Sequence, residues 1–269
     1  MFYQGIPLLP ARASGRAQAA ALAVLTPSES KRLIAKAVAA LPEVKRALQS
    51  GWVIIGRGTT NAFVAEEITG ARIEPKVRYA AGTIHPDVVG APRSPGQQVR
   101  QYVLHHGQPV ELAAEKTLEE FGPDDVYIKG ANAVDSLGNA GVLMGSTRGG
   151  IGGAAPTLAA RGSHLIVPVG LEKLVPSVTD VAPHMALHRY KHSTGMNAWL
   201  LPMQLGQVVT EVQAVKVLTG AAAFHAASGG IGGSEGSVVL LIEGDDAGVE
   251  KAWAIIQGIK GEPPVAWPG

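Results

Sequence analysis

The chain has 269 residues, with 23 basic and 22 acidic side chains and a formal net charge of +1. This balance argues against a protein that binds nucleic acid through its charge, and the absence of cysteine excludes disulfides, thiolate metal sites and cysteine nucleophiles. No apolar run approaches the ~18 residues of a membrane span, and no signal peptide is recognisable. We therefore expect a cytoplasmic protein with neither a nucleic-acid nor a membrane partner.

The N-terminal region divides into an arm and a helix. Residues 1–28 are rich in alanine, leucine and proline, which suggests an arm packed on the body of the protein or on a partner subunit. Apolar residues at helical spacing then predict a helix over 31–48, capped by Ser28 or Ser30. We expect Pro42 to kink or split this helix.

Short apolar strands and helices alternate through the next part of the chain. A strand at 52–55, a glycine-containing turn at 56–61 and a helix at 62–68 form the first unit. Further strands are predicted at 101–104, 126–128 and 165–169, further helices at 113–121 and 154–160, and an irregular segment at 70–100. This alternation favours an α/β fold with a mainly parallel open sheet flanked by helices.

The C-terminal part has a different pattern. Strands are expected at 207–212, 221–227 and 238–243, and helices at 214–219 and 247–259. The β-α-β-β-α order is typical of part of a small ferredoxin-like α+β unit. We therefore divide the chain into an arm at 1–28, an α/β ligand-binding domain at 29–204 and a small α+β lid or oligomerisation unit at 205–269.

The turn Gly56-Arg57-Gly58-Thr59-Thr60-Asn61 is the first candidate binding element. Its glycines let the backbone approach a ligand closely, and the following helix offers free N–H groups and a positive dipole end to an anion. Thr59 and Thr60 add hydroxyl donors, and Arg57 adds charge. The alternative is a tight strand-to-helix turn with a threonine cap.

A second candidate follows the strand at 126–128, where Lys129, Asn132 and Asp135 occur in close succession. Ligands of open α/β sheets bind beyond the carboxyl ends of the strands, so these side chains are candidate site residues. The alternative is that Lys129 is solvated and Asp135 caps a turn.

A third candidate is the glycine-rich loop at 145–153, which opens a helix. Its backbone N–H groups can form an anion-binding nest, and Arg148 can hold an anion in a bidentate manner. The alternative is a flexible loop. Ser146, Thr147, Gly149 and Gly150 belong to the same loop.

Three histidines, His184, His188 and His192, are spaced four residues apart, so a continuous helix would place them on one face. This spacing suits imidazole ligands of a metal or cationic residues that handle phosphate. Arg189, Lys191 and the Gly195 break favour an ordinary basic surface instead. We predict no metal site.

These segments, in this order, resemble type A ribose-5-phosphate isomerases. Residues 52–60 are similar to the strand and "GxGST" loop of that family, and 127–135 to its "DGADEVD" segment. The loop at 145–153 lies where the family has "KGGGGA", and 165–175, which includes Lys173, is similar to its strand plus "DESKLV". The resemblance covers roughly 30–176 and implies the fold of the wider NagB/RpiA/CoA-transferase-like superfamily. It also implies proton transfer between C1 and C2 of a phosphosugar, with the small C-terminal unit as a lid.

The chain departs from this pattern in its acidic residues. The family's glutamate base aligns with about Ala155, and neither glutamate nor aspartate occurs between Asp135 and Glu172. Lys129 and Asn132 replace the first two aspartates of "DGADEVD". A general base needs a titratable group, so Lys129 becomes a candidate for anion binding, for a base or for a Schiff base. It also has the charge to balance Asp135.

The sequence thus predicts a divergent, isomerase-like enzyme for a phosphorylated or carboxylated small metabolite, without the usual catalytic glutamate. The predicted catalytic residues are Lys129 and Asp135. The predicted substrate-binding residues are Gly56, Arg57, Gly58, Thr59, Thr60, Asn132, Ser146, Thr147, Arg148, Gly149, Gly150 and Lys173. We expect an anionic small-molecule ligand, a homo-oligomer and no cofactor. The alternatives are a CoA-transferase-like enzyme, a non-catalytic metabolite sensor or regulatory protein, and a structural oligomer component assembled through the arm.

Overall fold

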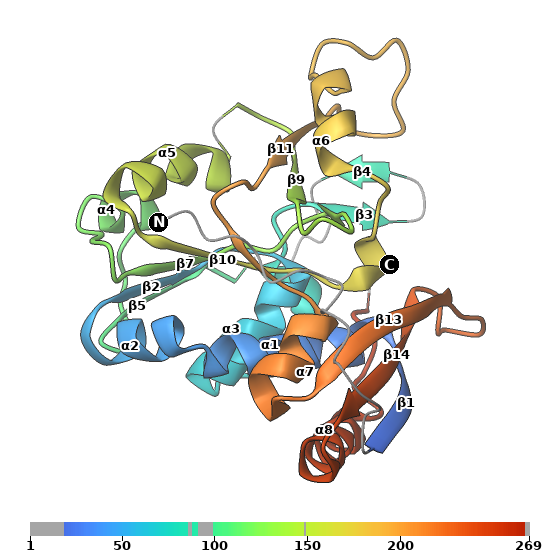
Figure 1. Ribbon diagram of the computed structural model, residues 1–269. Coiled ribbons are helices and arrows are strands. Elements are labelled where there is room, and N and C mark those ends of the chain that lie inside the picture. The colour runs from blue at the N-terminus through green and yellow to red at the C-terminus, as the bar shows by residue number, and fades with distance from the viewer. Residues whose placement is uncertain (1–18, 86–87, 91–98, 148, 267–269) are drawn as a thin grey trace.

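The computed structural model describes residues 19–85, 88–90, 99–147 and 149–266. Within them the chain has a mixed α/β fold, with a six-stranded mixed sheet flanked by helices and a three-stranded antiparallel sheet (Figure 1). In the described part of the chain, the helices are all too short or too polar to cross a membrane.

The central sheet has the strand order β12-β10-β7-β2-β5-β6. Its parallel strands are β12 (Gln207–Val209), β10 (His164–Pro168), β7 (Val126–Ile128) and β2 (Trp52–Ile55). Two further strands, β5 (Tyr102–His105) and β6 (Gln108–Pro109), are antiparallel. The expected mainly parallel sheet is therefore mixed. A two-residue turn with positive φ at His106 (48°) and Gly107 (73°) joins β5 to β6, as tight hairpins require.

Helices cover both faces of the central sheet, which explains its apolar strands. Figure 1 shows α1, α2, α3 and α7 on one side and α5 on the other. The helices of this part are α1 (Pro27–Ala40), α2 (Pro42–Ser50), α3 (Thr59–Thr69), α4 (Ala114–Thr117), α5 (Ile151–Arg161) and α6 (Val178–Val181). The expected helix at 113–121 is thus limited to the single turn of α4.

The predicted split of the first helix at Pro42 is confirmed, because α1 ends at Ala40 and α2 begins at Pro42. Its cap is Thr26, and not Ser28 or Ser30. The Thr26 hydroxyl accepts a hydrogen bond from the Glu29 N–H (3.3 Å), and the Glu29 carboxylate accepts one from the Thr26 N–H (2.9 Å). This capping box, together with a proline that suits the first helical position, starts the helix earlier than its apolar pattern indicates.

The second sheet combines the two ends of the described chain. Strand β1 (Ala19–Leu25) pairs with β14 (Ser237–Gly244), which also pairs with β13 (Ala222–Gly229). Helices α7 (Glu211–Thr219) and α8 (Asp246–Ile259) pack against it.

This arrangement corrects the expected domain boundaries. Residues 19–25 form a strand of the second sheet and are not part of an arm, while 1–18 lie outside the described residues. Strand β12 belongs to the central sheet, so 205–269 lacks the first strand of the expected ferredoxin-like unit. One hydrophobic core, which includes Leu25 and Ile54, extends across both sheets. The 29–204 and 205–269 segments therefore share a single packed interior.

Short elements complete the fold around the ends of the central strands. Strands β8 (Ala133–Val134), β9 (Ala140–Met144) and β11 (Trp199–Pro202) form one small sheet, and β3 (Thr83–His85) and β4 (Val88–Gly90) form another. Three 3-10 helices are η1 (Lys76–Tyr79), η2 (Leu171–Lys173) and η3 (Ala182–His184). These sheets lie above the central sheet in Figure 1, on the side where the cavity described below is found.

Candidate functional site

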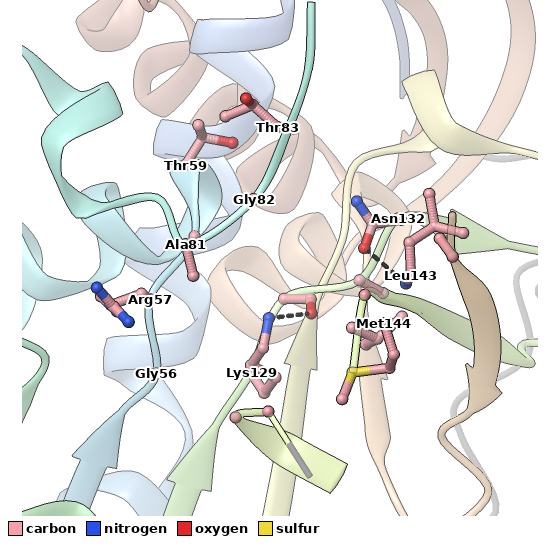
Figure 2. Close-up of a pocket in the computed structure, with 18 of the residues that line it drawn as sticks. Gly56, Arg57, Thr59, Ala81, Gly82, Thr83, Lys129, Asn132, Leu143 and Met144 are labelled. Carbon is pink, nitrogen blue, oxygen red and sulfur yellow. Dashed lines mark hydrogen bonds between the residues drawn. The ribbon is translucent and has the colours of Figure 1, made fainter. Parts of the chain in front are cut away.

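A cavity of about 430 Å³ lies beyond the carboxyl ends of β2 and β7, the position at which open α/β sheets bind ligands. Residues of four segments line it, at 56–60, 81–84, 129–132 and 142–146. Figure 2 shows these segments surrounding the Lys129 side chain. All three predicted binding loops therefore meet at one cavity, since Gly145, Ser146, Gly149 and Gly150 belong to the third.

The Gly56–Thr60 turn is held against the end of β7. The Gly56 N–H donates to the Ile128 carbonyl (2.8 Å), and the Gly58 N–H donates to the Tyr79 carbonyl (2.8 Å). A Cβ atom at Gly56 would lie 3.1 Å from both the Ile128 carbonyl oxygen and Lys129 Cδ. A side chain at position 56 would therefore require the Ile128 carbonyl or the Lys129 side chain to shift by a few tenths of an ångström.

The first turn of α3 faces this cavity. Thr59 is the first residue of the helix, Gly58 is its N-cap, and no side chain caps it. The alternative of a threonine-capped turn is therefore not realised. Thr59 and Thr60 line the cavity instead, so the first turn of the helix borders a space in which a helix N-terminus favours an anion.

Asn61 fixes the turn, a role that the sequence analysis did not assign. It is fully buried, and its Nδ2 group donates to the Gly56 carbonyl (2.6 Å) and to the Ile128 carbonyl (3.2 Å). One side chain thereby connects α3, the turn and β7. The sequence offered one sign of this role, which is the position of Asn61 at the end of the turn at 56–61. Only tertiary packing shows that its side chain faces inward.

Lys129 projects into the cavity from the end of β7 (Figure 2). Its Nζ donates to the Gly130 carbonyl at 3.2 Å, and within the described residues no carboxylate oxygen lies within 4.0 Å of it. Burial lowers its pKa, and the positive charges of Lys173 and Arg57 lower it further, to about 8. The neutral form of this lysine is therefore much more populated near physiological pH than that of an ordinary lysine, although the protonated form still predominates.

Lys173, at the end of η2, supplies a second amine to the cavity. Its Nζ donates to the Ala131 carbonyl (3.2 Å) and lies 3.8 Å from Glu172 Oε1. That same carboxylate oxygen is 2.6 Å from Lys31 Nζ. Burial and the charge of Lys31 lower the pKa of Lys173 to about 8, although Glu172 and Glu211 oppose this shift.

Positive charge dominates the cavity lining. Arg57, Lys129 and Lys173 all contribute to it, and Glu115 from α4 is the acidic residue among the described lining residues. Glu115 is solvent-exposed, whereas Tyr127 beside it is buried. Burial raises the pKa of Tyr127 to about 12, and the Glu115 charge adds to this effect. The sequence analysis missed both residues, because nothing in the local pattern of 113–121 distinguishes Glu115 from a surface glutamate.

Polar groups of the remaining loops complete the wall. The Asn132 Oδ1 atom accepts a hydrogen bond from the Leu143 N–H (3.0 Å), which leaves its Nδ2 group as a donor at the cavity (Figure 2). Ser146 Oγ accepts from the Gly149 N–H (3.0 Å) and so shapes the turn that precedes α5. Gly150 has a φ of 55°, a conformation that favours glycine at the N-cap of this helix.

The structure brings most of the predicted site together. The predicted residues that line the cavity are Gly56, Arg57, Gly58, Thr59, Thr60, Lys129, Asn132, Ser146, Gly149, Gly150 and Lys173. Thr147 is exposed and is not among the lining residues. Arg148 lies outside the described residues.

Asp135, which was predicted to be catalytic, is not among the residues that line the cavity. It is 1% exposed, and its carboxylate accepts hydrogen bonds from the N–H groups of Leu137, Asn139 and Val178, each at 3.0 Å. The Asn139 side chain donates to it as well. Burial alone would raise the pKa of Asp135, but these hydrogen bonds outweigh burial and lower it. Asp135 therefore caps a turn, as the alternative interpretation had it.

The three histidines do not share a helix face. Helix η3 ends at His184, and His188 and His192 follow in irregular structure. The part of the chain that the structure describes contains no group of three residues able to hold a metal ion.

Comparison with protein-family models, with curated proteins and with solved structures finds no match for this chain. The assignment of function therefore depends on the cavity itself.

Proposed function

We propose that the protein is an enzyme that acts on a phosphorylated or carboxylated small metabolite. The observation that carries the proposal is the charge of the cavity lining. Arg57, Lys129 and Lys173 belong to the lining, and Glu115 is the acidic residue among its described members. Gathering several positive charges around a desolvated cavity is unfavourable, so a bound anion would offset part of this cost. A volume of about 430 Å³ suits a small metabolite.

The anionic group of this ligand would lie between the cations and the first turn of α3. Thr59, Thr60 and the helix N–H groups are donors that a phosphate or a carboxylate accepts from, and the Asn132 amide adds another. Because phosphate and carboxylate share this chemistry, the test below separates them.

For the reaction we propose an aldose–ketose type of isomerisation on a NagB/RpiA/CoA-transferase-like fold. The support is that three segments that resemble motifs of type A ribose-5-phosphate isomerases meet at one cavity. These segments are 56–60, 129–132 and 149–150. Proton transfer between neighbouring carbons needs a base and a positive group that stabilises the developing oxyanion. Glu115 or neutral Lys129 has the chemistry of the base, and Lys173 has the charge for the second task.

A non-catalytic metabolite-binding protein is the second candidate. The observation in its favour is Asp135, because the carboxylate predicted to be catalytic is occupied by backbone and side-chain hydrogen bonds outside the cavity. Binding without turnover would distinguish this function from the enzyme.

Thermal shift with a matched panel of compounds tests binding. The panel contains phosphosugars and sugar acids, the same sugars without the charged group, CoA thioesters and orthophosphate. A ligand that binds only the native state raises Tm according to its excess over Kd. We expect a shift with one phosphosugar or sugar acid and none with its neutral counterpart. Equal shifts with charged and neutral forms would contradict the proposal, and a response to CoA thioesters alone would favour a CoA-transferase-like enzyme.

Two variants connect the shift to the cavity. Lys129→Met and Lys173→Met should abolish the ligand-induced shift, whereas Lys45→Met on the exposed face of α2 removes the same charge without touching the cavity. Turnover is followed by NMR in D₂O, since an isomerase exchanges the proton on the carbon beside the carbonyl. Binding without exchange or product would identify a sensor.

A further inference from the structure

Lys129 differs from every other lysine of the chain in its surroundings. The others either lie within 4.0 Å of a carboxylate oxygen or are solvent-exposed. The first group is Lys31, Lys36, Lys76, Lys173 and Lys260, and the second is Lys45, Lys116, Lys191, Lys216 and Lys251. Lys129 is partly buried in a cavity, with the carbonyl of Gly130 as its hydrogen-bond acceptor.

We propose that Lys129 Nζ forms a Schiff base with the carbonyl carbon of the anionic ligand, while Lys173 and Arg57 hold the anionic group. This inference rests on the proposed function and deepens it, because it restricts the ligand to an aldehyde or ketone that also has a phosphate or a carboxylate. The geometry in its support is an amine that projects into the cavity next to two other cations and away from carboxylates.

The electrostatics of the cavity prepare this amine for attack. A lysine becomes a nucleophile when it is neutral, and desolvation or a neighbouring cation is how proteins favour that form. Burial together with the charges of Lys173 and Arg57 lowers the pKa of Lys129 to about 8. A bound anionic group would neutralise part of that surrounding charge after it had brought the carbonyl into place.

The step balances without an oxidant or reductant. The Nζ lone pair forms a bond to the carbonyl carbon, and the C=O π pair moves to the oxygen, which takes up a proton as Nζ loses one. The carbinolamine hydroxyl then takes up a proton from an acid and leaves as water, while the nitrogen lone pair forms the C=N bond of a protonated imine. Glu115 lies on the cavity lining and has the chemistry to transfer these protons. The protonated imine withdraws electrons from the adjacent C–H bond, which favours the proton transfer proposed above.

Lys173 is the less suitable nucleophile of the two amines. Its pKa is also lowered to about 8, but its Nζ lies 3.8 Å from Glu172 Oε1 and donates to the Ala131 carbonyl, so its ammonium form has a carboxylate beside it that Lys129 lacks among the described residues. This environment suits a group that holds an anion, so the two lysines receive different roles.

Reductive trapping tests the proposal. The full-length protein is incubated at pH 8 with limiting glyceraldehyde 3-phosphate or glyoxylate in the presence of sodium cyanoborohydride, which reduces an imine to a stable secondary amine. Intact mass and peptide mapping then locate the adduct. We expect one adduct per chain, on Lys129, with at least one of these probes, and at least tenfold less with uncharged glyceraldehyde. Adducts confined to Lys173 or to exposed lysines would overturn the proposal.

Variants and a non-reactive probe separate formation of the Schiff base from binding of the anion. Lys129→Arg keeps the charge but cannot form an imine, so we expect it to keep the thermal shift with the probe and lose the trapped adduct. Lys45→Met should trap as the natural sequence does. Glycerol 3-phosphate, which has no carbonyl, should bind without reacting and protect Lys129 from glyceraldehyde 3-phosphate.

The outcomes distinguish failure of the inference from failure of the proposed function. A thermal shift with a charged probe but no adduct on Lys129 would contradict the Schiff base and leave anion binding intact. The absence of both shift and adduct with the two charged probes would contradict the Schiff base and count against the proposed function as well.

Discussion

The side-chain amide of Asn61 donates a hydrogen bond to the carbonyl of Gly56, 2.6 Å away, and a second to the carbonyl of Ile128. These bonds hold the cavity turn against the central sheet. We expect Asn61→Ala to lower the free energy of unfolding by about 1–3 kcal/mol, because two buried carbonyls lose a donor. Urea unfolding measures this change, with the exposed Gln49→Ala as a control.

The same substitution should also weaken binding of the ligand identified by thermal shift, because the turn that presents Thr59 and Thr60 loses its anchor. A stable Asn61→Ala protein with unchanged affinity would show that the turn keeps its shape through the backbone bonds of Gly56 and Gly58 alone.

Asp135 should contribute to stability and not to the chemistry of the reaction. Its pKa is lower in the folded protein than the ~3.9 of an unfolded chain, so its stabilising effect is fully present above about pH 4 and is lost as the pH falls through the folded value. We expect Asp135→Asn to be less stable than the natural sequence at pH 7, and the difference to shrink below pH 4. Denaturant unfolding from pH 3 to pH 7 measures it.

Ligand binding provides the control for Asp135, because the residue lies outside the cavity. The folded Asp135→Asn protein should retain its affinity for the ligand at pH 7. A loss of turnover or binding in a variant that remains fully folded would return Asp135 to the catalytic residues.

Replacing either cavity lysine should stabilise the empty protein. The pKa of Lys129 is about 8 when folded and near 10.5 when unfolded, so the unfolded state binds more protons between these values. The resulting destabilisation is complete below pH 8 and disappears as the pH rises through 10.5. We expect Lys129→Met to raise the free energy of unfolding at pH 7 by about 1–3 kcal/mol.

Lys173→Met should act in the same direction, since its pKa is lowered to the same value. It should also raise the pH midpoint of trapping at Lys129 above 8, because one of the cations that lower the Lys129 pKa is removed. A gain in stability at pH 7 that persists unchanged at pH 10.5 would mean that packing, and not charge burial, is its cause.

Strand β1 should be required for stability, although the sequence assigned it to an arm. It pairs with β14 along all seven of its residues and buries Ala23 and Leu25. We expect a chain that begins at residue 26, which keeps the Thr26 cap of α1, to melt at least 5 °C below a chain that begins at residue 19, from the loss of these two side chains and the strand pairing. Thermal unfolding of the two chains is the measurement.

The expected homo-oligomer stays a prediction, and truncated chains can test it. Sedimentation of the full chain and of the chain beginning at residue 19 compares their masses while β1 is kept in both. A multimer formed by the full chain and lost in the shorter one would assign assembly to residues 1–18, and a monomer in both would contradict it.

Local patterns predicted most of the elements but not how they combine. The apolar runs at 52–55 and 126–128 are strands with the expected bounds, and 31–48 divides at Pro42. Strand β1 escaped notice because it is largely alanine, which has a weak strand preference. The pairing of β12 with β10 in the central sheet could not be predicted. The residues of a strand do not by themselves show whether it joins a small antiparallel unit or the edge of a parallel sheet.

The candidate site was predictable where it follows the ends of strands. Gly56–Thr60 and Lys129 come directly after β2 and β7, and the rule for parallel strands brings them together. Asp135 belongs to the same sequence motif as Lys129, but the turn at 135–139 directs its carboxylate to backbone donors. Glu115 enters the cavity from α4, and only tertiary structure reveals such an approach.

The pairing of β1 with β14 joins residues that are more than 200 positions apart. The ribosome makes β14 more than 200 residues after β1, so β1 waits for the synthesis of that whole segment before it can pair. Closing such a long segment is slow compared with local pairing, and exposed strand edges associate readily during the delay. The chain also has its first and last described strands side by side, which makes it a natural candidate for circular permutation. A permutant opened at a surface loop of the central sheet would synthesise β14 before β1 and greatly shorten the segment between these two paired strands.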